Sequence, residues 1–135
     1  MEVVMHLYRC AVVPLTLVMG LAGAWAGTPA EQLTALSAQA GRSPNPVAGQ
    51  QFFNAKHGRE WSCASCHGAL PTAEAKHAST GKAIAPLAPV FNPERFTDAA
   101  KSEKWFRRNC NDVLARECTA AEKADVLAWL ISLKR

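Results

Sequence analysis

Residues 63 to 67 read Cys-Ala-Ser-Cys-His, and this pentapeptide constrains the chain more than any other feature of its sequence. Two thiols three positions apart can reach the two vinyl groups on one edge of a porphyrin. The adjacent imidazole can then coordinate the iron from one side of the ring. The motif therefore predicts one covalently bound haem c with its iron, attached at Cys63 and Cys66, with His67 as the proximal ligand.

Two other chemistries use similar residues. A zinc site could combine this motif with Cys110 or Cys118, but the second half of the chain lacks the compact ligand spacing of structural zinc sites. A redox-active dithiol would need a βαβ context, and the sequence shows no alternating strand pattern of useful length. Haem attachment is the favoured interpretation.

The first 26 residues have the pattern of a segment that directs export. An apolar run at 10–23, interrupted by Gly and Pro, is too short to span a membrane, and Ala24-Trp25-Ala26 fits a signal peptidase site. We therefore expect 1–26 to be a cleaved signal peptide. Residues 27–135 are expected to form one domain in the periplasm, with no stable membrane anchor.

Helix signals dominate the remaining sequence, which predicts an all-α fold. Thr28, Pro29 and Glu31 form a helix start, and this helix is expected to end after residue 40. A short helix is expected at about 47–56, and another begins at Thr97 or Asp98 and ends near Asn109. A capping box at Thr119 begins the last helix. Gly49 and Phe53 before the attachment motif, and Trp129 in the last helix, resemble the residues at which small cytochromes c cross their terminal helices. This resemblance implies that the second and last helices cross there.

The second axial position of the iron is constrained by composition. All three Met residues, at positions 1, 5 and 19, lie in the expected signal peptide, so a Met ligand is excluded from the mature chain. The candidates are His57, His77, a Lys, an Asn or no ligand at all. His57 is too close to Cys63 to reach over the ring easily, and His77 lies in a long loop.

Asn109 is the favoured candidate because of its neighbours. It follows Trp105 by four residues and Phe106 by three, so all three share one helical face. The two aromatic rings should be buried, and the porphyrin is the largest apolar surface available to them. Asn111 is the close rival, two residues further along.

Two further groups of residues complete the predicted site. Cys110 and Cys118 are the cysteines not needed for haem attachment, and in an exported protein they are expected to form a disulfide. The haem propionates need cationic partners, for which the candidates are Arg95, Arg107 and Arg108. The chain has a formal net charge of only +4, and its basic residues are scattered along the sequence. Nucleic-acid binding is therefore not expected.

Several stretches of the chain resemble the family of sphaeroides haem protein and cytochrome c double-prime. They are 80–89 (TGKAIAPLAP), 92–98 (NPERFTD), 106–112 (FRRNCND), 117–119 (ECT) and 122–125 (EKAD). The resemblance covers essentially the mature chain and implies a small class I-like cytochrome c fold. It also implies a Cys110–Cys118 disulfide beside the haem, and Asn109 as a sixth ligand that leaves ferric iron on reduction. In cytochrome c double-prime the corresponding position is His.

The resemblance implies a function as well. Departure of the ligand would let oxygen, nitric oxide or carbon monoxide bind the ferrous form, and a dihaem cytochrome c would be the electron donor. The alternative is a plain electron-transfer cytochrome that stays six-coordinate, for instance through His77. A haem enzyme would need a distal acid–base pair, which the sequence does not place, so we do not expect an enzyme.

Overall fold

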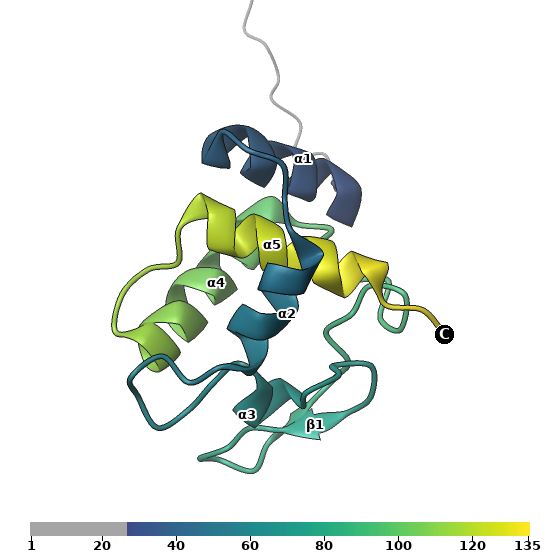
Figure 1. Cartoon of the computed structure of the whole chain (residues 1–135). Coiled ribbons are helices and arrows are strands. Elements are labelled where there is room, and N and C mark those ends of the chain that lie inside the picture. Colours follow the sequence, from purple (N-terminus) through teal and green to yellow (C-terminus); the bar gives the residue numbers. More distant parts are fainter. Residues whose placement is uncertain (1–26) are drawn as a thin grey trace, which may run out of the picture.

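The computed structural model describes residues 27–135, and the expected signal peptide at 1–26 lies outside them. Over this range the chain folds into helices around a central helix, with a small hairpin at one end (Figure 1). The elements are α1 (Pro29–Ala40), α2 (Pro46–Asn54), α3 (Ala64–His67), β1 (Ala75–Lys76), β2 (Ala83–Ile84), α4 (Ala99–Leu114) and α5 (Ala120–Ser132). None of the described helices is long and apolar enough to cross a membrane.

The predicted helix starts are confirmed by their caps. Thr28 and Glu31 form a reciprocal capping box at α1, and Thr119 and Glu122 form another at α5. The Asp98 side chain accepts a hydrogen bond from the Lys101 amide at the start of α4. Each cap satisfies amides that have no partner within the helix.

The predicted helix ends are less accurate. The prediction that the third long helix ends near Asn109 is wrong, because α4 continues to Leu114. It ends at Ala115, which adopts a left-handed conformation with φ 59°. That conformation normally favours glycine. The second helix ends at Asn54 rather than near 56, and the short β1–β2 hairpin pairs Ala75 with Ile84 and Lys76 with Ala83.

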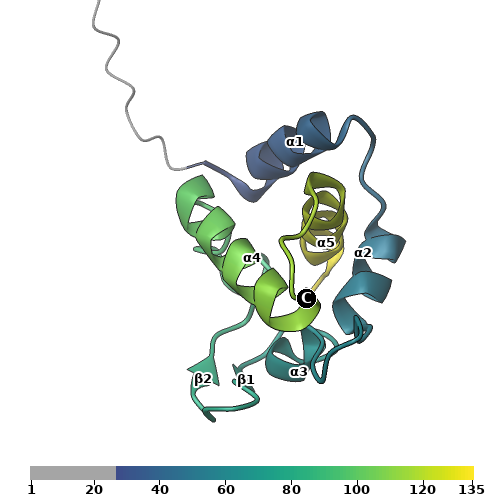
Figure 2. The same cartoon turned by 90° about the vertical axis from the view of Figure 1, so that its left-hand side faces the viewer.

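The core forms where α2 crosses α5, as the resemblance implies. Figure 2 looks along α5, with α1 above it, α2 on one side and α4 on the other. The rings of Phe53 and Trp129 lie 5.0 Å apart at the crossing. Gly49 faces the backbone of α5 directly, and a Cβ there would lie only 2.7 Å from the Val126 nitrogen and closer still to the Asp125 carbonyl group. The missing side chain is what lets the two backbones approach.

An ion pair between the exposed Arg42 and the buried Asp125 holds the turn before α2 against α5. Both oxygens of Asp125 accept hydrogen bonds from Arg42, at 3.0 and 2.6 Å, and the Asn45 amide donates to Oδ1 at 2.7 Å. Burial by itself raises the pKa of Asp125. The hydrogen bonds from Arg42 and Asn45 outweigh burial, so its net pKa is lowered.

Two further polar contacts tie α1 and α4 to the rest of the fold. The buried Gln32 side chain donates to the Phe96 carbonyl at 2.7 Å, which joins α1 to the loop before α4. The buried Lys123 ammonium on α5 contacts both oxygens of Glu103 on α4, at 2.6 and 2.8 Å. The first contact holds α1 against the loop before α4, and the second holds α4 beside α5.

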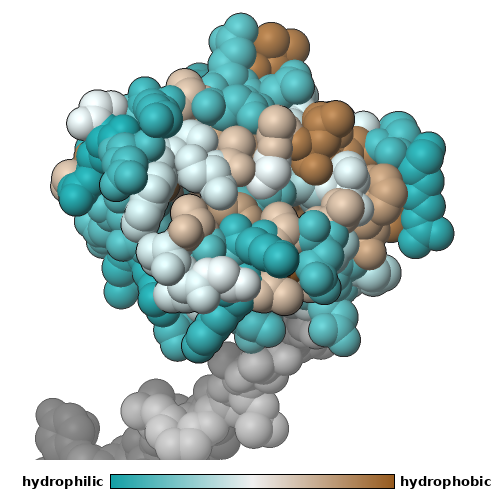
Figure 3. Space-filling view, turned by 90° about the horizontal axis from the view of Figure 1, so that it is seen from below, coloured by the Kyte–Doolittle hydropathy of each residue, from teal (hydrophilic) through white to brown (hydrophobic). Residues whose placement is uncertain are grey.

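Hydrophilic side chains dominate the end of the molecule that carries α3 and the hairpin. Figure 3 views this end from below, with hydrophobic side chains in small groups among hydrophilic ones. The large apolar side chains exposed in the described chain are Val47, Leu70, Val90 and Trp105. Scattered exposure of this kind is ordinary for a folded domain.

Replacing Gly49 by Ala should destabilise the fold strongly. The new Cβ would overlap the Asp125 carbonyl group, so the helices must separate at the crossing. We expect a loss of more than about 2 kcal/mol in the free energy of unfolding, measured by denaturant titration. Gln50→Ala changes an exposed position one residue away and serves as the control. Equal stability of the two variants would show that the helices do not cross closely at Gly49.

Asp125→Asn should remove part of the acid sensitivity of the fold. Because the folded-state pKa of Asp125 is lowered, its ion pair stabilises the protein above the unfolded-state pKa of about 3.9. That stabilisation is lost as the pH falls through the folded-state pKa. At neutral pH the free energy of unfolding of the variant should be lower by about 2 kcal/mol. Between about pH 5 and pH 3, its melting temperature should fall less than that of the wild type, because the variant lacks the carboxylate that titrates in this window. The exposed Asp112→Asn is the matched control.

Candidate haem site

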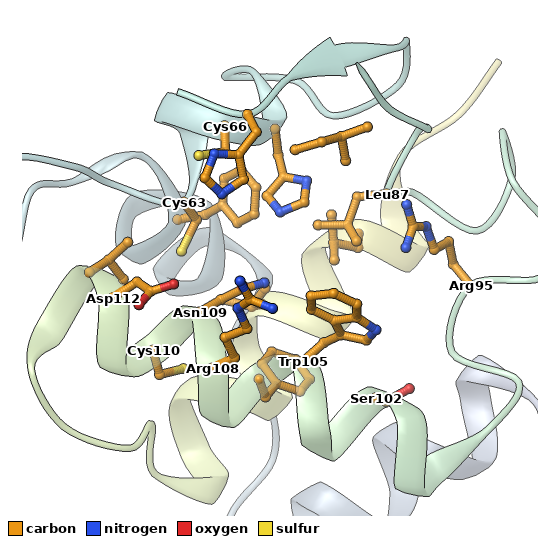
Figure 4. Close-up of a pocket in the computed structure, with 18 of the residues that line it drawn as sticks. Cys63, Cys66, Leu87, Arg95, Ser102, Trp105, Arg108, Asn109, Cys110 and Asp112 are labelled. Carbon is orange, nitrogen blue, oxygen red and sulfur yellow. The ribbon is translucent and has the colours of Figure 1, made fainter. Parts of the chain in front are cut away.

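A cleft of about 710 Å³ lies between α4 and the opposite wall formed by α3, the hairpin and the loop that precedes α4 (Figure 4). Its volume is in the range of protein cofactor pockets. Phe53, Val126 and Leu130 close its floor, since they belong both to its lining and to the core. The cleft is therefore continuous with the α2–α5 crossing.

The attachment motif forms the upper wall of the cleft in Figure 4. Cys63 directly precedes α3, and both Cys63 and Cys66 are free, half-buried thiols that line the cleft. Burial raises the pKa of the Cys63 thiol to about 11. A redox-active dithiol needs a lowered thiol pKa, so this environment does not support the dithiol alternative.

His67 ends α3 and also lines the cleft. Its ring lies 6.1 Å from that of Phe53, between centroids. Burial, with smaller effects from the nearby charges of Arg95 and His77, lowers the pKa of His67 to about 4. At neutral pH the imidazole is therefore uncharged, which is the form that can coordinate iron.

The zinc alternative lacks its remaining ligands. Cys110 on α4 is joined to Cys118, just before α5, by a disulfide with a Cα–Cα distance of 5.6 Å. Among residues 27–135 there is no group of three or more His, Cys, Asp or Glu side chains placed to bind a metal ion. The donor set at α3 thus suits a haem, which supplies the iron and four of its ligands itself.

The wall opposite α3 is built from α4. Asn109 is half-buried and lines the cleft together with Trp105 and Phe106, so the structure brings these three predicted residues together. Phe106 packs against the core cluster. Trp105 is 44% exposed and lines the edge of the cleft, and its expected packing against the porphyrin stays a prediction.

The rival axial ligands have other surroundings. Asn111 is exposed, does not line the cleft, and donates from Nδ2 to the Arg107 carbonyl at 2.8 Å. His57 lies outside the cleft, with Nε2 2.8 Å from the Phe52 carbonyl oxygen. His77 does line the cleft, and its Nδ1 accepts from the Ser79 amide at 3.3 Å.

The three candidate arginines separate into two groups. Arg95 and Arg108 line the cleft, whereas Arg107 does not and faces Glu117 at 3.7 Å. Arg95 is half-buried and donates from Nε to the Pro86 carbonyl and from Nη2 to the Ala85 carbonyl. Arg108 is exposed and holds its guanidinium 5.6 Å from the centre of the Trp105 ring.

Sequence reasoning missed part of the cleft. Apolar side chains from the loop between α3 and α4 also line it, among them Ile84, Leu87 and Phe96. They come from a Pro-rich segment with no helical or strand periodicity, so no pattern marks them as buried. Lys101, in the first turn of α4, was missed as well.

The chain is similar to known proteins in both sequence and structure. A sequence family described as Domain of unknown function (DUF1924) matches residues 39–130. Cytochrome c-type protein SHP of Cereibacter sphaeroides is 47% identical over 107 residues, which cover 76% of this chain and 82% of that protein. Cytochrome c'' of Methylophilus methylotrophus is 44% identical over 94 residues, which cover 67% of this chain and 65% of the relative.

Solved structures of the same two proteins are similar in fold. Oxidised SHP, described as an oxygen-binding cytochrome c, matches with a TM-score of 0.75 and 44% identity over 79% of this chain and 98% of that one. Oxidised cytochrome c'' from Methylophilus methylotrophus matches with a TM-score of 0.70 and 35% identity over 79% of this chain and 95% of that one.

Opening the Cys110–Cys118 disulfide should destabilise the wall that carries Asn109. Cys118→Ser should lower the free energy of unfolding by about 2.5 kcal/mol, because the short closed loop restricts the unfolded chain. The double variant Cys110→Ser/Cys118→Ser should lose about the same amount, since either change alone breaks the bond. In the unmodified protein neither thiol should react with an alkylating agent until a reductant is added. Immediate alkylation of Cys110 would contradict the disulfide.

Proposed function

Since this chain belongs to the family of SHP and cytochrome c'', it is a monohaem cytochrome with one covalent haem c, and we propose that Cys63, Cys66 and His67 hold that haem. The two thiols would form the thioether bonds, and His67 would coordinate the iron. Their shared place on one wall of the cleft and the neutral state of His67 support this assignment. The bound haem supplies a one-electron redox centre and one further coordination position.

The observation that carries the rest of the proposal is the position of Asn109. Its half-buried carboxamide lies on α4, across the cleft from the α3 wall that carries the proposed proximal ligand (Figure 4). Asn111, by contrast, is exposed and bonded to its own helix. We assign Asn109 as the sixth ligand of the ferric state.

The chemistry of a carboxamide favours a ligand that changes with oxidation state. Its oxygen is a neutral, hard donor, which suits ferric iron better than the softer ferrous iron. Asn109 would therefore hold its place in the oxidised protein and leave it on reduction. Its departure would admit oxygen, nitric oxide or carbon monoxide. The relative described as an oxygen-binding cytochrome c supports the same reading.

Further parts of the proposal concern the surroundings of the haem. Arg95 is the best placed partner for a propionate, because two carbonyl groups already fix its guanidinium at the cleft. Trp105 and Phe106 would pack against the porphyrin, and Arg108 remains a second candidate for a propionate. The proposal does not extend to Arg107, which faces Glu117 away from the cleft.

We also infer a cellular role. The protein would be exported to the periplasm through the segment 1–26 and would exchange electrons with a partner cytochrome, for which a dihaem cytochrome c is our candidate. The net charge of +4 favours an acidic partner surface. In this role the protein transfers electrons and binds gas rather than catalysing a reaction. The competing function is a plain electron carrier ligated by His77, which also lines the cleft.

Asn109→Ala should convert the ferric haem to a high-spin form, or let water take the vacated position. Absorption spectra of the oxidised protein measure this directly. Carbon monoxide binding by the reduced protein should be nearly unchanged, because Asn109 has already left the iron in that state. Asn111→Ala is the matched control, since it removes the same carboxamide from an exposed position two residues away.

Three outcomes separate the alternatives. A changed ferric spectrum in Asn109→Ala alone supports the proposal. A change in Asn111→Ala alone would move the ligand by two residues. A change in His77→Ala alone would replace the gated cytochrome with the plain electron carrier.

A further inference from the structure

Arg108 has an unusual place beside the proposed sixth ligand. It directly precedes Asn109 on α4, it is exposed, and it lines the cleft. Its guanidinium lies over the Trp105 ring, 5.6 Å from the centroid, and Figure 4 shows it between Asn109 and Trp105, directed toward the α3 wall. The face of an aromatic ring attracts a cation, so Trp105 positions the charge at the mouth of the cleft.

Arg108 also keeps its charge free for other partners. Within residues 27–135 the ion pairs join other groups: Arg42 with Asp125, Arg107 with Glu117, Arg116 with Glu122, and Lys123 with Glu103. Lys101 also belongs to none of the ion pairs within the described residues, and it lines the cleft from the same helix. Two unpaired cations therefore face this side of the cleft from α4.

The acidic groups of the cleft only partly oppose these cations. Asp98 accepts from the Lys101 amide at the start of α4, and Glu122 is paired with Arg116 and with its own cap. Glu94 and Asp112 complete the acidic lining. Asp112, one helical turn beyond Arg108, is the acid nearest to it in sequence, and it does not pair with Arg108 within 4.0 Å in the described chain.

We propose that Arg108 makes the distal side of the cleft selective for small inorganic anions, such as azide and nitrite, over neutral diatomic gases. The inference rests on the proposed function, because it needs the position that Asn109 vacates. Arg108 is a specificity-determining residue here, and Lys101 and Trp105 support it. Neutral ligands gain little from the same charge, so they reveal whether a change is electrostatic or structural.

Elementary electrostatics sets the size of the effect. A cation at the mouth of an apolar cleft concentrates anions near it, and such steering can raise association rates by about 10- to 1,000-fold. Added salt screens it over a Debye length of about 10 Å at 0.1 M ionic strength. The effect should therefore be largest at low salt and should concern anions alone.

The test compares charge changes on neighbouring positions of one helix. Arg108→Gln removes the charge at the cleft, and Arg107→Gln removes the same charge from an adjacent exposed position outside it. Affinity and association rate are measured optically on the ferric holoprotein with azide and nitrite as anions and with nitric oxide as the neutral ligand. The same series in the Asn109→Ala background removes competition from the native ligand.

Arg108→Gln should slow azide association about tenfold, weaken its salt dependence, and leave nitric oxide binding near the wild-type value. Arg107→Gln should resemble the wild type, and Asp112→Asn should bind azide more tightly. Equal losses in Arg107→Gln and Arg108→Gln would overturn the inference, since net charge alone would then explain them. A parallel loss of nitric oxide binding in Arg108→Gln would also overturn it. A shifted reduction potential with unchanged azide binding would overturn it too, because that result is the signature of a propionate partner.

The spectra of the Asn109→Ala protein keep the two hypotheses apart. If its ferric spectrum equals that of the wild type, the proposed ligand is wrong and the inference falls with it. If that spectrum changes as expected while Arg108→Gln binds azide like the wild type, only the anion selectivity is wrong.

Discussion

The direct contact between the backbones of α2 and α5 at Gly49 determines where everything else in the molecule lies. A side chain at this position would overlap the α5 backbone, so the close crossing exists only because glycine has none. Four residues after Gly49, Phe53 meets Trp129. The same crossing directs the chain after α2 toward α3, and it thereby places the attachment motif above the apolar core. The site is built outward from this single contact.

The α4 helix is attached to that core by different means. A salt bridge from Lys123 to Glu103, a disulfide from Cys110 to Cys118, and the ring of Phe106 hold it in place. Much of its inner face borders the cleft instead of another helix. A haem in the cleft would complete the hydrophobic core that α2 and α5 begin. On this view the cofactor contributes to the stability of the folded protein as well as to its chemistry.

Local signals in the sequence were sufficient for the helix starts, whereas the main helix crossing was expected from the resemblance to small cytochromes c. Thr28, Asp98 and Thr119 cap helices as side-chain chemistry predicts, and Gly49 meets α5 as expected. The end of α4 could not be predicted in this way. Ala115 takes the left-handed conformation that usually marks a helix end with glycine, so the sequence offers no stop signal there.

That error had a consequence for the choice between Asn109 and Asn111. Two residues of a continuous helix differ by about 200° in direction, so only one of the two can face the cleft once α4 is known to extend to Leu114. The apolar loop residues Ile84 and Leu87 were also beyond prediction. Their burial depends on contacts between segments distant in sequence, such as the hydrogen bond from the Leu87 amide to the Pro71 carbonyl.

Because the backbone around position 109 is regular helix, the side chain that would face the iron can be replaced without changing the fold. The residue lies within α4, with a full turn of helix on either side, and any helix-compatible side chain can occupy it without a new backbone conformation. A change in one codon could place Asn, His, Gln or Met at this position, while the disulfide and the core keep the rest of the fold unchanged. A family built on this scaffold could therefore diversify its iron chemistry in single steps, each variant inheriting a folded and stable protein.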